Sequence, residues 1–142
     1  MRPNSATVLV GGYDINTDVG CYSGWSAAGQ PTFQKQGSGG GGGAFTYWGA
    51  AAARDPQDHV YIAGSGGDQF ACSAELDRVN TGGAFDTTFG TAGQVILQDT
   101  NSPPAFEYDF RAVAVGADGR IVVGGSKKDS SGSFPMLARY WP

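Results

Sequence analysis

The sequence repeats itself, and this repeat limits what the chain can fold into more than any other feature. Residues 44–65 and 105–126 align without a gap at a distance of 61 residues, and each copy ends in an apolar run followed by Gly-Ser. A third, shorter copy lies upstream, because residues 8–12 (VLVGG) match residues 121–125 (IVVGG). Such internal similarity predicts structural units that pack against their neighbours.

Each unit is predicted to contain four short strands, because β-branched, aromatic and small apolar runs alternate with Gly, Asp, Asn and Pro. In the middle unit these strands are expected at about residues 47–54, 59–63, 69–78 and 93–98. The dipeptide Asp118-Gly119 between two such runs predicts a type I′ hairpin turn, which needs positive φ. No segment has a sustained 3.6-residue apolar period, so no helix longer than one turn is expected.

Four antiparallel strands per unit of roughly 40 to 60 residues are typical of a β-propeller blade. Stacked blades cover the faces that one sheet alone would leave open. We therefore predict an all-β fold of about two and a half to three four-stranded antiparallel blades. The chain is expected to be one domain, with units at about residues 1–43, 44–98 and 99–142.

The two end units are each expected to lack a strand. Either several chains associate to complete a propeller, or the sequence is part of a longer polypeptide. Because both faces of the strand at residues 120–123 are expected to be covered, the substitution Val122→Asp is expected to unfold the chain.

Charge and hydropathy exclude two classes of partner. The formal net charge is −4, and Lys127 and Lys128 are the only adjacent cations, so a nucleic-acid surface is not expected. No apolar run approaches 18 residues, which argues against membrane insertion, and residues 1–10 lack the apolar centre of a signal peptide. Protein partners, self-association and glycans remain as binding hypotheses.

Part of the repeat resembles a known family. Residues 110–126 (FRAVAVGADGRIVVGGS) and 134–140 (FPMLARY) resemble the bacterial delta-60 repeat, and residues 85–95 (FDTTFGTAGQV) resemble the closing strand of that family. The middle copy departs at residues 55–61, where it is similar to a related class of bacterial propeller repeat. Residues 1–43 match only through two short stretches.

The resemblance implies a β-propeller in a large secreted or surface-attached bacterial protein. It implies no catalytic residues, because the family offers no common catalytic motif to carry over. An extracellular or cell-surface location is therefore expected, although no signal peptide is seen in the chain.

Three side chains suggest one cofactor hypothesis, a bound calcium ion. Asp14, Asn16 and Asp18 place oxygen atoms at alternate positions of a loop that ends in Gly20, and calcium prefers such hard oxygen ligands. The glycine stands one place late for an EF-hand, and no glutamate follows at the required distance. The alternative is a hairpin loop stabilised by Asx hydrogen bonds.

Aromatic residues suggest a glycan hypothesis. Trp25, Tyr47 and Trp48 offer ring faces on which a sugar could stack, although blade cores also use large aromatic residues. The pair Glu107 and Asp109 could in principle cleave glycosides, with a structural role as the favoured alternative.

Two further features leave their alternatives open. His59 is the only histidine, and it begins a predicted strand, which favours a structural role over general-base catalysis. Whether the two cysteines, Cys21 and Cys72, are oxidised cannot be derived from their spacing.

The leading functional hypothesis is therefore a non-catalytic β-propeller module for protein–protein interaction or self-assembly in a secreted or surface bacterial structure. The first alternative is a lectin-like glycan-binding propeller. The second is a fragment of a propeller-type glycoside hydrolase.

Overall fold

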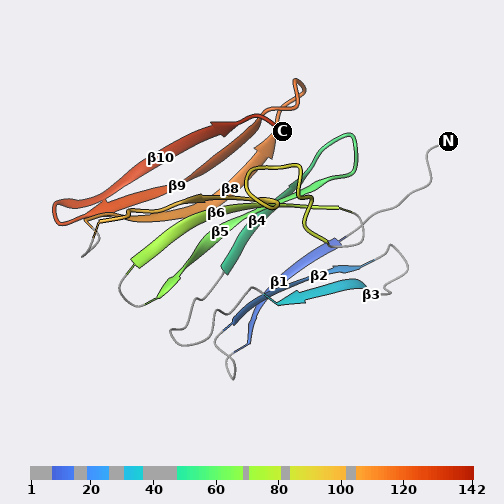
Figure 1. Ribbon diagram of the computed structural model, residues 1–142, viewed down its shortest axis with the longest axis horizontal. Helices are drawn as coiled ribbons and strands as arrows, with labels where there is room; N and C mark the ends of the chain where they lie inside the picture. The colour runs from blue at the N-terminus through green and yellow to red at the C-terminus, as the bar shows by residue number, and fades with distance from the viewer. Residues whose placement is uncertain are drawn as a thin grey trace.

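The computed structural model describes residues 8–14, 19–25, 31–36, 48–68, 71–80, 84–101 and 105–142, with side chains at residues 51–66, 73–80, 84–101 and 105–142. Ten strands and no helix occur in these ranges, and the strands form three antiparallel sheets (Figure 1). The all-β prediction is confirmed for the described residues, which contain no helix of membrane-spanning length. That the sheets are propeller blades stays a prediction.

The sheets follow one another in the order of the chain. The first contains β1 (Val8–Asp14), β2 (Val19–Trp25) and β3 (Pro31–Gln36). The second contains β4 (Trp48–Arg54), β5 (Val60–Asp68), β6 (Ala71–Val79) and β7 (Gln94–Leu97). The third contains β8 (Glu107–Val115), β9 (Ile121–Asp129) and β10 (Gly132–Tyr140).

The 61-residue offset of the sequence recurs in the backbone. The pairing of β4 with β5 has a β-bulge between Gly49 and Ala51, and the pairing of β8 with β9 has one between Phe110 and Ala112. Each bulge lies at the same distance from the apolar run of its partner strand. A bulge inserts one residue and bends its strand, so the two leading strands bend at equivalent places.

The turn that follows each bulged strand is also repeated, but it is not the predicted type I′ turn. The amide of Gly119 donates to the carbonyl of Gly116 at 3.0 Å, and only Gly119, with φ 81°, has positive φ in this turn. The equivalent Asp58 donates to Asp55 at 3.1 Å and has φ 74°. Both turns are therefore type I turns followed by one left-handed residue, the other common route through a short hairpin.

The three sheets lie as successive layers (Figure 1). Strand β8 contacts β4, β5 and β6 of the second sheet, and β4 contacts β1 and β2 of the first. By the sequence alignment, β1 is the equivalent of β5 and β4 is the equivalent of β8. The same packing relation, a leading strand laid across the preceding sheet, therefore occurs twice.

The described core lies between the second and third sheets. Its buried members come from both sheets: Tyr61, Ala63, Ala74, Leu76, Phe89, Phe110, Ile121 and Val123. Side chains of a strand alternate between the two faces of its sheet. Tyr61 and Ala63 therefore face the third sheet, whereas Val60 and Ile62, both 4 % exposed, lie on the opposite face of β5.

Val122 does not occupy the covered position that the sequence predicts. Its neighbours Ile121 and Val123 are fully buried against the second sheet, but Val122 points to the other face of the third sheet and is 39 % exposed. The expected unfolding by Val122→Asp is therefore wrong for this chain. The pattern predicted an apolar strand correctly, but it assumed a neighbouring sheet on both sides.

Strand β10 forms one edge of the third sheet, because the strand order is β10, β9, β8. It pairs with β9 along its whole length, with Pro135 opposite Ser126. Proline has no amide hydrogen and is confined mainly to edge strands, so its place here agrees with the sheet order.

Candidate functional site

Most of the sequence-predicted site residues lie at the margins of what the structure describes. Asp14 ends β1, but Asn16 and Asp18 lie outside the described residues. Trp25 ends β2 and Trp48 begins β4, whereas Tyr47 lies outside. No side chain of these six residues is described, so the calcium and glycan hypotheses both stay predictions.

The carboxylates of β8 have cationic neighbours. Glu107 accepts a hydrogen bond from the ammonium group of Lys128 at 3.2 Å, and Asp109 pairs with Arg111. Both pairs are solvent-exposed, where ion pairs contribute little to stability. Each carboxylate is thus engaged by a cation on its own sheet.

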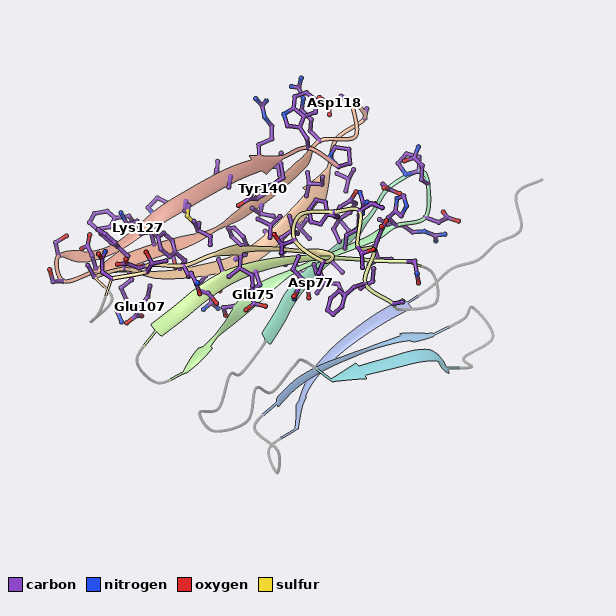
Figure 2. All side chains as sticks on the ribbon, viewed as in Figure 1. Glu75, Asp77, Glu107, Asp118, Lys127 and Tyr140 are labelled. Carbon is purple, nitrogen blue, oxygen red and sulfur yellow. The ribbon has the colours of Figure 1, made fainter. Side chains whose placement is uncertain are left out.

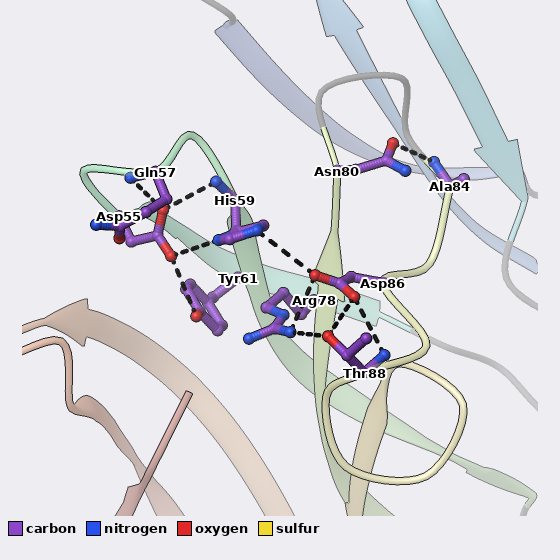
Figure 3. A network of polar contacts seen from close by, with 9 residues as sticks. All are labelled: Asp55, Gln57, His59, Tyr61, Arg78, Asn80, Ala84, Asp86 and Thr88. Atoms are coloured by element: carbon purple, nitrogen blue, oxygen red, sulfur yellow. Dashed lines mark hydrogen bonds and ion pairs between the residues drawn. The ribbon is translucent and has the colours of Figure 1, made fainter.

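A network of polar contacts centres on Asp55, at the turn between β4 and β5 (Figure 3). One oxygen accepts the backbone amides of Gln57 and His59, both at 2.9 Å. The other contacts His59 Nδ1 at 2.8 Å and accepts the Tyr61 hydroxyl at 3.3 Å. Burial alone would raise the pKa of Asp55, but the hydrogen bonds and the charge of His59 outweigh it and lower that pKa.

The second half of this network lies between β6 and β7. Asp86 accepts the amide and hydroxyl of Thr88, at 3.1 and 2.7 Å, and forms an ion pair with Arg78 at 2.9 Å. The hydrogen bonds from Thr88 are the main reason why the pKa of Asp86 lies below its usual value. The Arg78 guanidinium also stacks over the ring of Phe89, 5.0 Å from its centre.

His59 joins the two halves of the network. Its Nδ1 faces Asp55, and its Nε2 lies 3.6 Å from a carboxylate oxygen of Asp86 (Figure 3). The imidazole therefore ties the β4–β5 turn to the segment that follows β6. Because both ring nitrogens face carboxylates that are themselves hydrogen-bonded, this arrangement is suited to holding two loops together.

A pair of acids lies on the other face of the second sheet. Glu75 and Asp77 alternate along β6, and Figure 2 shows both on the side where β1–β3 lies. Asp77 is 2 % exposed and accepts a hydrogen bond from Gln94 at 2.9 Å. Burial, aided by the charge of Asp77, raises the pKa of Glu75 to about 7, although a hydrogen bond from Ser73 acts against it.

The most extensive exposed feature is one face of the third sheet, which we call the outer face. Cross-strand pairs share a face, so its members follow from the register of β8, β9 and β10. They are Ala112, Ala114, Val122, Gly124, Leu137 and Arg139. Five of these six residues are exposed, and Leu137 is 80 % exposed.

Each member of the outer face has a counterpart in the second sheet, 61 residues earlier. The counterparts are Ala51, Ala53, Tyr61, Ala63, Leu76 and Arg78. Tyr61, Ala63 and Leu76 are fully buried there, because the third sheet covers them. Leu76 and Leu137 thus occupy the same place in the repeat, one at 0 % and the other at 80 % exposure.

Sequence reasoning missed the outer face, although the signal was present. The gap-free alignment continues beyond residue 126, so that Leu137 falls on Leu76 and Arg139 on Arg78. Extending it would have identified these positions as the ones that a following sheet covers. The Asp55–His59–Asp86 network had no such signal, because its two halves are distant in the sequence.

Comparison with known proteins found no family model, no curated protein and no solved structure that matches this chain. The resemblance to the delta-60 repeat is therefore a prediction from the residues alone. Function has to be argued from the repeat and from the outer face.

Proposed function

We propose that this chain is a non-catalytic β-propeller module that acts through protein–protein contact or self-assembly. The observation that carries the proposal is the exposure of Leu137 and Val122 at positions whose counterparts, Leu76 and Tyr61, are buried by a neighbouring sheet. Apolar positions that a neighbour covers once in the repeat are suited to being covered again.

The propeller part of the proposal is supported by the way the sheets succeed one another. A leading strand, β4 or β8, lies across the preceding sheet in both steps along the chain. The bulges and turns also recur at the 61-residue offset. Regular succession of small antiparallel sheets is how propeller blades cover their faces. From the resemblance to the delta-60 repeat, we place the module in a secreted or surface bacterial structure.

Burial of the outer face would be favourable by an amount that is easily measured. Covering a leucine side chain stabilises by about 1.5–3 kcal/mol, and Leu137 is still 80 % exposed. The small residues around it, Ala112, Ala114 and Gly124, leave room for a partner to approach the backbone closely. The face has the flat apolar character of a contact surface.

The proposal is tested with Leu137→Arg and a matched control, Ile96→Arg, which places the same charge on an apolar residue of β7 that is 50 % exposed. The unmodified chain is expected to associate with rising concentration and to bind a fluorescent apolar dye. Leu137→Arg should reduce both signals at unchanged melting temperature, and Ile96→Arg should leave them as they are. If Leu137→Arg leaves both unchanged, the outer face is not the contact surface.

A further inference from the structure

The outer face has a defined shape that narrows the choice of partner. Its counterpart in the second sheet is covered by β8, which crosses β4, β5 and β6. A covering element must therefore present a sheet with buried-type residues at the register positions of Ile121 and Val123 or of Val60 and Ile62. These four residues are 0–4 % exposed in this chain.

The first unit of the chain offers the same register positions. In the alignment, Val8 and Val10 fall on Val60 and Ile62 and on Ile121 and Val123. The outer face thus continues an interface that already exists between the second and third sheets. The first unit of another copy carries the sequence that such an interface requires on its other side.

We propose that a second copy of this chain docks on the outer face, head to tail, through its β1–β3 sheet. This inference rests on the proposed function and adds the partner and the mode of contact. The two surfaces differ, so the contact is heterologous, and each copy keeps one free surface of each kind. Association therefore continues beyond a dimer unless a ring closes.

The size of the surface predicts a weak junction. Three strands of nine residues give a planar area of roughly 30 Å by 14 Å, which is on the order of 400 Å² on each copy. Contacts of this size lie at the small end of specific interfaces. We expect reversible association that depends on protein concentration.

The test uses the full chain and two variants, Leu137→Arg on the outer face and Val10→Arg in the first unit. Sedimentation over a wide range of concentration should show the unmodified chain growing past a dimer. Each variant alone should remain monomeric, because each lacks one of the two surfaces. An equimolar mixture should form dimers and stop there, because one intact junction can form between the two variants.

Cross-linking gives a second measurement that does not depend on how well Val10→Arg folds. A photo-reactive residue in place of Leu137 should attach to residues 8–36 of another copy, as read by peptide mass mapping. Attachment to residues 107–140 of the other copy would mean a symmetric face-to-face contact and would overturn the head-to-tail mode. That result would leave the proposed function intact.

The remaining outcomes also decide the matter. A chain that is monomeric at all concentrations, or whose association survives Val10→Arg in a folded variant, overturns the docking of a second copy. If Leu137→Arg also leaves dye binding unchanged, the proposed function fails with it.

Discussion

Single residues at the sheet contacts show how closely the backbones approach. A Cβ on Gly125 would lie 1.8 Å from the carbonyl oxygen of Asp109, because the bulge in β8 brings that strand close. A Cβ on the adjacent Gly124 would lie 3.4 Å from Leu137 and 3.8 Å from Ala112, which are ordinary contacts. Two neighbouring glycines of one strand are thus present for different reasons.

We expect Gly125→Ala to lower the free energy of unfolding by about 1–3 kcal/mol or more, because the backbone of β8 has to move. Gly124→Ala should be neutral or should stabilise by up to about 1 kcal/mol, because alanine loses less entropy in a strand. Denaturant titration of both variants measures the difference. Equal effects of the two substitutions would contradict the close approach at the bulge.

Glu75 gives the protein a specific dependence on pH. Its pKa is raised from 4.5 to about 7 in the folded state, so the folded chain binds this proton more tightly than the unfolded chain. The free energy of unfolding therefore falls as pH rises from about 4.5 to 7, by on the order of 3 kcal/mol. Asp55 and Asp86 act in another window, because their lowered pKa values reduce stability only below about pH 4.

The variant Glu75→Gln should remove the dependence between pH 4.5 and 7. We expect it to be more stable than the unmodified chain at pH 8 and about equally stable at pH 4. Denaturant titrations at these two values measure the effect. A stability gain of the same size at both values would mean that the charge of Glu75 is not its cause.

At the scale of the strand, β9 shows that neighbouring residues meet different environments. Ile121 and Val123 pack on the second sheet with no exposed surface, whereas Val122 between them is 39 % exposed. An aspartate at position 123 would be buried without a partner and would cost several kcal/mol, a large part of the stability of a small domain.

We therefore expect Val123→Asp to unfold the chain and Val122→Asp to change its stability by less than about 1 kcal/mol. Circular dichroism during thermal denaturation distinguishes the two. Loss of the folded signal in both variants would mean that a neighbour covers the outer face under the conditions of the measurement, and dilution would then restore the folded form of Val122→Asp.

At this scale the sequence predicted the elements well and their turns less well. The runs of apolar residues located β4 to β7 within a few residues, because such runs bounded by Gly, Asp and Pro have few other solutions. The turn at Asp118-Gly119 was predicted with the wrong type, because the hydrogen bond closes one residue earlier, from Gly119 to Gly116. A dipeptide indicates positive φ but not which residue begins the turn.

For the whole molecule, the repeat predicted the order of the sheets but not which faces remain open. Exposure of Leu137 depends on whether another sheet follows, and no local pattern contains that information. The meeting of His59 with both Asp55 and Asp86 likewise depends on how the chain returns after β6. Both features arise from tertiary contacts between segments that are distant in the sequence.

The proline of β10 decides in which direction copies of this molecule can accumulate. Without an amide hydrogen at Pro135, a foreign strand that pairs along this edge loses one hydrogen bond of its ladder, which hinders ribbon-like aggregation. The broad side of the same sheet carries no such obstacle. Growth is thus guided toward piling of sheets, and sideways extension of the kind found in amyloid is disfavoured.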